Sequence, residues 1–338
     1  MRKLVKRAAL SVLKSAGLFR AFESSRWRRD GVAILCYHGI SLTDEHEWDP
    51  SLYMSPEDFE RRLEILKKRR YSVLPLGEAI ERIHARDLPP KSVAITFDDG
   101  AYDFYRRAWP LLRAYEFPAT VYLTTYYSEY NRPVFNTAAS YLLWKARGRI
   151  LDGAKLGLRK SLDLRTAASR RSAWLWLLAE AEASGMDAAR KDELLQALAA
   201  AAGVDYSVLL RKRLLHIMTP AEVAELAAAG CDIQLHTHRH RTPLDRSLFV
   251  REIRDNRERI EAASGAPAIH FCYPCGFYRP EFLPWLAAER VVSATTCEPA
   301  LARASSNRLL LPRFVDHANL SPVEFEAGIS GFTLALRR

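Results

Sequence analysis

Short apolar runs with strand character alternate with helical segments along most of this chain, and this alternation constrains the fold more than any other feature. The eight runs lie at residues 33–37, 71–76, 93–97, 119–124, 232–236, 270–273, 292–296 and 310–315. Strands that alternate with helices pair in parallel, and parallel strands can close into a barrel whose active groups gather at the carboxyl ends of the strands. We therefore predict an α/β fold of the (β/α) barrel type.

Three helix starts can be predicted from local chemistry. Ser55, Thr219 and Ser321 are each followed by proline and, three positions after the hydroxyl residue, by an acid. In this pattern the hydroxyl caps the first turn, proline fits the first helical position, and the acid reaches back to the cap. Helices are therefore expected to begin directly after these three residues.

The sequence pattern divides the chain into three parts. Residues 131–214 contain no strand-like run and consist of predicted helices rich in Ala, Leu and Arg, which indicates a helical insertion. Residues 31–130 and 215–338 are expected to form the barrel, and residues 1–30 a basic N-terminal arm. Because insertions at the carboxyl end of a barrel often shape the substrate site, the helical segment is expected to lie near it.

Two clusters of potential metal ligands stand at the ends of two predicted strands. Asp98 and Asp99 come directly after one strand, and His236 and His240 close another. Two histidines and one carboxylate can bind a zinc-like ion and leave one position open for water. Because side chains alternate along a strand, only one of the adjacent aspartates is expected to reach the metal, and the other can act as a base. The clusters predict a metal-dependent hydrolase.

Both clusters belong to longer motifs. Thr-Phe-Asp-Asp-Gly at residues 96–100 and His-Thr-His-Arg-His at residues 236–240 resemble the first two motifs of the polysaccharide deacetylases, the carbohydrate esterase group (family 4) that shares the NodB homology domain. The resemblance covers roughly residues 31–130 and 215–320 in the same order. It implies a distorted TIM-like barrel of that family's type. It also implies that the protein removes N-acetyl groups from amino sugars of a polysaccharide or lipid-linked glycan.

The resemblance also assigns roles to individual residues. It implies that Asp98 is the general base. It implies that Asp99, His236 and His240 bind a divalent metal ion, with zinc as the expected metal. His238, between the two histidines, is expected to have a structural role instead of binding the metal.

Two family motifs are altered in this sequence. Where the third motif has an arginine and an aromatic residue, this chain has Cys272 and Cys275, so the arginine that orients the base is missing from its usual place. A backbone amide can stabilise an oxyanion whatever its side chain, so the amide of Cys275 is still expected to polarise the acetyl carbonyl. The last family motif usually supplies a histidine as general acid, and the nearby candidate here is His317.

Three residues are predicted to contact the substrate. The resemblance places His38 beside the site, and a satisfied strand end is the alternative for this residue. It also places Tyr273 there, as part of the third motif. Trp48 lies in an acidic, aromatic segment that is either a substrate-contacting loop or a surface turn.

The N-terminal arm carries most of the net charge. Residues 1–29 contain nine Lys or Arg and one acid, which gives +8 of the formal +10. Leu, Val and Phe alternate with these bases, so the arm is expected to form a basic amphipathic helix that docks on an anionic membrane. The alternative is an arm that packs on the domain or frays. Lys14 interrupts the apolar stretch, which favours a retained arm over a cleavable signal peptide.

Other features narrow the location and the function. Five cysteines without a regular framework predict free thiols in a reducing compartment, so the expected location is cytoplasmic and peripheral at the inner face of the membrane. The body lacks a basic stripe, which disfavours nucleic acid as a partner. Two other functions are left open: a deformylase or deacylase of another amide on a membrane lipid carrier, and a catalytically silent glycan-binding scaffold.

Overall fold

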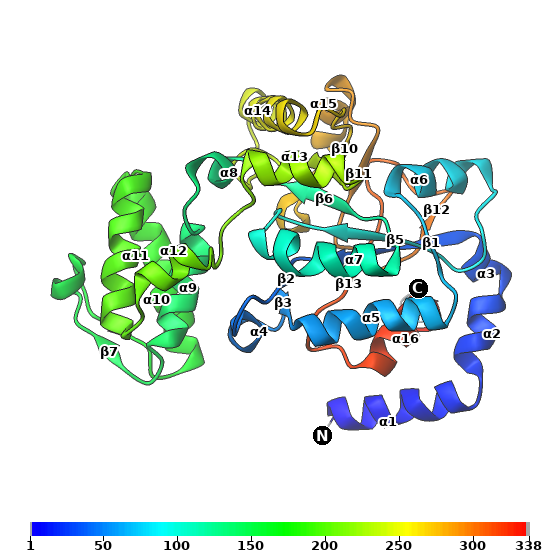
Figure 1. The fold of residues 1–338 in the computed structure, drawn as a ribbon, viewed down its shortest axis with the longest axis horizontal. Coiled ribbons are helices and arrows are strands. Elements are labelled where there is room, and N and C mark those ends of the chain that lie inside the picture. Colours follow the sequence, from blue (N-terminus) through cyan, green and yellow to red (C-terminus); the bar gives the residue numbers. More distant parts are fainter. Residues whose placement is uncertain (1, 336–338) are drawn as a thin grey trace.

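The computed structural model describes residues 2–335 and contains a curled sheet surrounded by helices (Figure 1). Six parallel strands follow the order β11-β10-β9-β6-β5-β1. Their bounds are β1 Gly31–Tyr37, β5 Ser92–Phe97, β6 Thr120–Leu123, β9 Asp232–Leu235, β10 His270–Cys272 and β11 Ser293–Thr295. Each of the eight predicted runs contains a strand, which confirms the predicted α/β fold.

Three further strands complete the sheet. β4 Ser72–Val73 pairs in parallel with the start of β5, and β12 Ala302–Arg303 pairs antiparallel with the start of β1. β13 Phe314–Val315 pairs in parallel with β1, and Leu311, just before it, bridges to Thr295 in β11. Residues 311–315 therefore connect the two outer strands and bend the sheet toward a closed barrel, as the sequence predicts.

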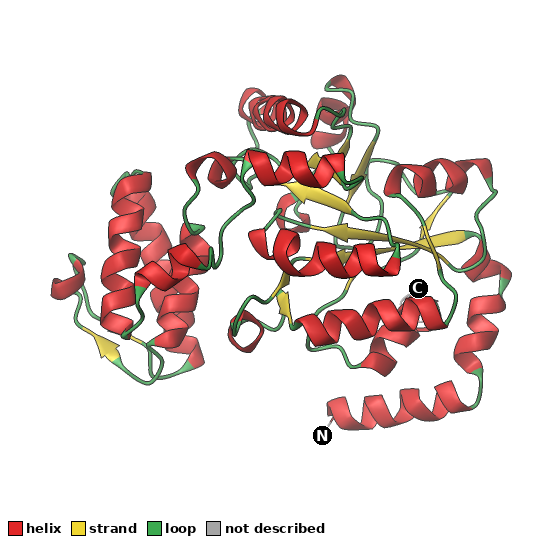
Figure 2. Ribbon diagram, viewed as in Figure 1, coloured by secondary structure: helices red, strands yellow, loops and turns green. Residues whose placement is uncertain are grey.

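Helices cover the outside of this sheet, as the red ribbons around the yellow strands show in Figure 2. They are α5 Pro56–Lys68, α6 Leu76–Ala85, α7 Trp109–Tyr115, α13 Pro220–Ala228, α14 Arg246–Ser264, α15 Phe282–Ala288 and α16 Pro322–Ile329. Ser55 and Thr219 each accept a hydrogen bond from the backbone N–H three residues on, and Glu324 accepts one from the N–H of Ser321. The three predicted helix starts are confirmed.

Smaller elements join these parts. They are α4 Glu45–Trp48, the paired strands β2 Gly39–Ile40 and β3 Tyr53–Met54, the π-helix Phe104–Ala108, the 3-10 turns Ala154–Leu156 and Pro274–Gly276, and α17 Phe332–Ala335. β1 and β5 are buried along their whole length, as expected for parallel strands covered on both faces.

A helical group with its own apolar core stands beside the barrel (Figure 1). It contains α8 Tyr126–Tyr130, α9 Phe135–Lys145, α10 Ala167–Ala183, α11 Ala188–Ala202 and α12 Tyr206–Arg211. Leu142, Leu177 and Leu198 are among its buried side chains. The expectation of no strands in this segment is wrong in one detail, because β7 Ile150–Leu151 and β8 Leu162–Asp163 form a short antiparallel pair.

The N-terminal arm packs on the barrel. It forms α1 Arg2–Ser15, α2 Leu18–Ser24 and α3 Arg26–Arg29, and α1 lies along α16. Glu324 pairs with Lys6 at 2.9 Å and with Arg7 at 3.0 Å, and Glu326 pairs with Lys14. The structure therefore shows an arm that packs on the domain, which was the alternative in the sequence analysis. Membrane docking stays a prediction. Among the described residues, no helix is both long enough and apolar enough to cross a membrane.

Candidate active site

The acidic motif lies where β5 ends. The backbone N–H of Asp98 donates to the carbonyl of Tyr37, which extends the pairing of β5 with β1. Asp99 and Gly100 then adopt left-handed backbone conformations, with φ of 69° and 76°. A Cβ added to Gly100 would meet Cδ1 of Leu123 at 2.3 Å, so only glycine fits this turn. The turn directs the two carboxylates to different partners.

The carboxylate of Asp99 meets both histidines that were expected to bind a metal. Its Oδ1 lies 3.3 Å from Nε2 of His236 and 3.1 Å from Nε2 of His240. Left-handed conformations at Thr237 and His240 curl the loop after β9, so histidines four residues apart face one point. The structure therefore brings the three expected ligands together.

This donor set fits a zinc-like cation. Nδ1 of His236 donates to the carbonyl of Cys272 at 2.9 Å, which leaves the lone pair of Nε2 free to face Asp99. The side chains of Asp99 and His240 are 36% and 38% exposed, so water can reach a fourth position. Burial raises the pKa of Asp99, but the charge of His240 and hydrogen bonds from both histidines outweigh it and hold that pKa well below its usual range.

Asp98 is held by an arginine that the sequence analysis did not assign to the site. Nη1 of Arg313 lies 2.6 Å from Oδ1 of Asp98, and Nη2 lies 2.7 Å from Oδ2. Arg313 is fully buried, and its Nε donates to the carbonyl of Thr296 at 2.9 Å. Burial raises the pKa of Asp98, but the charge of Arg313 and its hydrogen bonds outweigh it and lower that pKa well below its usual range. The carboxylate is therefore ionised and fixed in orientation.

Cys272 leaves room for this arginine. Its Sγ lies 3.1 Å from Nη2 of Arg313 and 3.5 Å from Oδ2 of Asp98. The guanidinium thus reaches the base from the segment before β13, although the third family motif places its arginine at the position of Cys272 in β10. The one sequence signal was an arginine inside the apolar run 310–315, because a buried arginine requires a charged or polar partner.

A second layer of polar groups fixes the histidine loop. His238 is buried, its Nδ1 lies 2.9 Å from Oγ1 of Thr125, and it stands outside the ligand group, in line with its expected structural role. Asn256 accepts from the backbone N–H of His236 and donates to the carbonyl of Leu123. The sequence analysis did not single out Asn256, which a helix of otherwise ordinary composition brings to this loop.

Two further predicted residues, His38 and His317, lie at the same end of the barrel. Nε2 of His38 is 3.9 Å from Oδ2 of Asp98, and its side chain is partly exposed, so it lines the site. The backbone N–H of Asp316 donates to the carbonyl of Cys36, which places His317 level with His38 just beyond the strands. The role of His317 as general acid stays a prediction.

The altered third motif forms a turn after β10. Cys275 has a left-handed conformation with φ of 56°, and its thiol side chain is exposed. Gly276 follows with φ of 67°, where an added Cβ would lie 3.0 Å from Cβ of Cys297. All five cysteines are free. The amide of Cys275 therefore belongs to a constrained turn at the catalytic end, and its role as oxyanion donor stays a prediction.

The predicted substrate contact of Tyr273 is wrong. This side chain is fully buried, and its hydroxyl donates to the carbonyl of Leu309 at 3.1 Å, so it belongs to the core. Trp48 packs against Tyr53 and Tyr141, with ring centroids 5.7 and 5.5 Å apart. Trp48 therefore joins its loop to the helical insertion, and a contact with substrate stays a prediction.

The site geometry agrees with a comparison against known families. A model of the polysaccharide deacetylase family matches residues 85–152 and 186–290, just over half of the chain. The chain belongs to the polysaccharide deacetylase family. Poly-beta-1,6-N-acetyl-D-glucosamine N-deacetylase of Escherichia coli (strain K12) is 31% identical to this chain over 96 residues. That match covers 28% of this chain and only 14% of the E. coli protein.

Solved structures show the same fold. Streptococcus pyogenes deacetylase PplD, in complex with acetate, matches with a TM-score of 0.59 and 19% identity, over 88% of this chain and 98% of PplD. IcaB from Ammonifex degensii matches with a TM-score of 0.54 and 17% identity, over 90% and 97% of the two chains. At sequence identities of 19% and 17%, the similarity between these structures and this chain shows a shared fold.

Proposed function

We propose that this polysaccharide deacetylase is a metal-dependent hydrolase that removes N-acetyl groups from amino sugars of a polysaccharide or lipid-linked glycan. One observation carries the proposal. Two hydrogen bonds from Arg313 orient the carboxylate of Asp98 beside the point where Asp99, His236 and His240 converge. The named activity of the E. coli relative and the acetate bound to PplD support an acetylated amino sugar as substrate.

The proposed reaction cleaves the amide bond of the acetyl group by water and gives acetate and a free amine. Asp99, His236 and His240 would hold a divalent cation, and their nitrogen and carboxylate donors suit zinc. When bound, such a cation supplies Lewis acidity next to the scissile carbonyl.

Groups of the protein would transfer the protons and stabilise the oxyanion. Asp98 accepts the proton of the attacking water, and Arg313 fixes the carboxylate in the orientation that this transfer needs. The amide of Cys275 donates to the developing oxyanion. His317 returns a proton to the nitrogen as the carbon–nitrogen bond breaks.

Acetate release from N-acetylglucosamine oligosaccharides tests the proposal. The purified protein should release acetate, lose this activity in a chelator, and regain it when zinc is added back. Formate release from formylated substrates, measured in parallel, separates deacetylation from deformylation of a lipid carrier. If the protein loaded with zinc releases no acetate from any acetylated oligosaccharide and no formate from formylated lipid-carrier substrates, the proposed activity is wrong and the silent-scaffold alternative is favoured.

We also propose that the enzyme works in the cytoplasm at the inner face of the membrane. The basic composition of residues 1–29 and the five free thiols support this location.

A further inference from the structure

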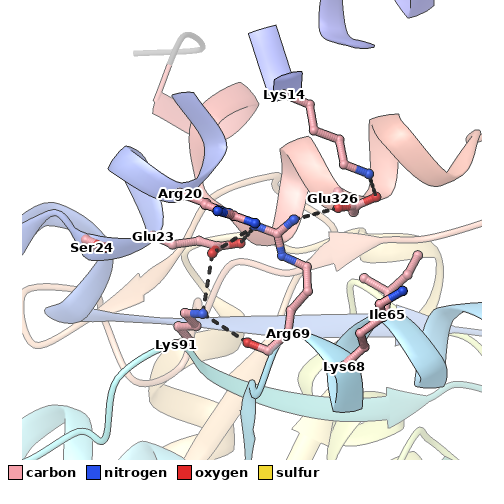
Figure 3. Close-up of a pocket in the computed structure, with 9 residues that line it drawn as sticks. All are labelled: Lys14, Arg20, Glu23, Ser24, Ile65, Lys68, Arg69, Lys91 and Glu326. Carbon is pink, nitrogen blue, oxygen red and sulfur yellow. Dashed lines mark hydrogen bonds and ion pairs between the residues drawn. The ribbon is translucent and has the colours of Figure 1, made fainter. Parts of the chain in front are cut away.

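A cationic cavity lies between the N-terminal arm and the barrel, built by residues outside the catalytic motifs. It has a volume of about 570 Å³. Its walls come from α1, α2, α5, α16 and the residues directly after α5 and directly before β5, and Figure 3 shows the side chains. The residues that line it are Lys14, Arg20, Glu23, Ser24, Ile65, Lys68, Arg69, Lys91 and Glu326. Five of them are cationic and two are acidic, so the cavity carries a net positive charge.

The two carboxylates are already engaged with cations of the cavity. Glu23 accepts from Arg69 at 2.9 Å and lies 3.5 Å from Nζ of Lys91. Glu326 pairs with Arg69 at 2.9 Å and also with Lys14 (Figure 3). Arg69 therefore bridges both acids. These pairs hold the arm on the barrel and fix the shape of the cavity.

Two cations of the cavity are left for an external anion. Arg20 and Lys68 are both exposed, and neither has a carboxylate partner among the residues that the structure describes. They come from α2 and α5, so they border the cavity from two different elements. A phosphate group carries negative charge and several acceptor oxygens, which is the chemistry that two such cations and the hydroxyl of Ser24 recognise.

The outer face of α1 is apolar. Leu4, Val5 and Val12 are 71%, 64% and 67% exposed. They share one side of the helix, since residues seven and eight positions apart lie on the same face. The basic residues Lys6, Arg7 and Lys14 instead reach α16. The arm thus presents these apolar side chains to the surroundings, and the cationic cavity lies beside the carboxyl end of α1, at Lys14.

We propose that this cavity binds the phosphate of an anionic phospholipid headgroup while Leu4, Val5 and Val12 enter the interfacial region of the bilayer. Free phosphate would use the cations alone and would leave the apolar face of α1 in water. An anionic bilayer satisfies both features at once, because it combines phosphate charge with an apolar layer. This inference names the docking site for the membrane location proposed above and does not rest on the catalytic activity.

Vesicle co-sedimentation of the full chain tests the cavity. The probes are vesicles of phosphatidylcholine alone and of equal parts phosphatidylcholine and phosphatidylglycerol. Wild type should bind the second kind only. R20E/K68E should lower its partition coefficient about tenfold or more, since each cation near an anionic surface contributes to binding. R171E/R190E makes the same charge change at exposed arginines of α10 and α11, and it should bind as wild type does.

Two further measurements complete the test. L4S/V5S/V12S, checked for an unchanged circular dichroism spectrum, should bind anionic vesicles more weakly than wild type. Calorimetry with inorganic phosphate separates the two sources of the anion. Phosphate binding without vesicle binding overturns the proposal, and so does an equal loss of binding in R20E/K68E and R171E/R190E. The variant D98N should dock like wild type, so a failure of docking is distinguishable from a failure of catalysis.

Discussion

At the level of single residues, this chain differs from its family mainly in having Cys272 in place of the third-motif arginine, and Arg313 supplies the missing guanidinium. Cys272 stands where the third motif has arginine, yet Asp98 still receives two charge-assisted hydrogen bonds. The planar guanidinium can match both carboxylate oxygens at once, which a lysine ammonium cannot do. The positive charge beside the base is therefore kept while its position in the sequence has changed.

This exchange predicts the behaviour of substitutions at Arg313. R313K should lower kcat about a hundredfold, because Asp98 loses its fixed orientation. KM and zinc content should change little, because the guanidinium of Arg313 donates to Asp98 and to the carbonyl of Thr296, neither of which is a predicted metal ligand. Initial rates of acetate release and metal analysis of the same preparation measure both effects.

A rescue variant sharpens this prediction. C272R/R313S returns the arginine to the family's usual position and should recover part of the lost kcat relative to R313S. A wild-type kcat for R313S would contradict a positioning role for Arg313. Circular dichroism of each variant is the folding control, because an unpaired buried Asp98 also lowers stability.

At the level of elements, local chemistry determined what could be predicted. The strands and the helix starts after Ser55, Thr219 and Ser321 follow from patterns within a few residues. Tyr273 was misassigned because membership in a motif does not say whether a side chain enters the core or faces the site. The ion pairs between α1 and α16 could not be predicted either. The basic composition of α1 is equally suited to binding an anionic membrane and to packing on an acidic helix, and α16 lies about 300 positions away in sequence.

The contact of α1 with α16 predicts a pH-dependent stability. Burial raises the pKa of Glu324, but hydrogen bonds from Ser321 and the pairs with Lys6 and Arg7 outweigh it and lower that pKa to about 2. A carboxylate whose pKa is lower in the folded protein stabilises it above the ordinary pKa, and that contribution is lost as the pH falls toward 2.

The variant E324Q tests this dependence. Its Tm at pH 7 should lie about 2 °C below that of wild type, and the difference should shrink below the ordinary glutamate pKa. E258Q, at an exposed position of α14, is the matched control and should melt like wild type at every pH. A Tm difference that is the same at pH 7 and pH 3 would contradict the assigned role of Glu324.

At the scale of the whole molecule, closure of the barrel assembles the site. Residues 311–315 bridge β11 and β1, and this bridge carries Arg313 to the end of β5. The two ligand clusters could be predicted because each follows its own strand and parallel strands end on one side. The pairing of Arg313 with Asp98 could not be predicted from the sequence. It depends on which strands pair to close the barrel, and no local sequence pattern specifies that strand pairing.

Metal binding should stabilise the whole chain. At a hundredfold excess of zinc over Kd, the Tm of protein freed of metal by a chelator should rise by about 3 °C, because the ion binds only the folded state. H240A should show no rise, since it removes one of the three ligands. H317A should show the full rise with a lowered kcat. Differential scanning calorimetry gives these values, and a full rise in H240A would exclude His240 as a ligand.

The central claim is that two adjacent aspartates have different roles, Asp99 as a metal ligand and Asp98 as the base. The most direct measurement compares D98N with D99N, two isosteric changes at neighbouring positions, for zinc content and for acetate release. D98N should bind zinc like wild type and lose turnover about a hundredfold or more, whereas D99N should lose both zinc and turnover. Wild-type turnover in D98N, or a full zinc content in D99N, would contradict the account.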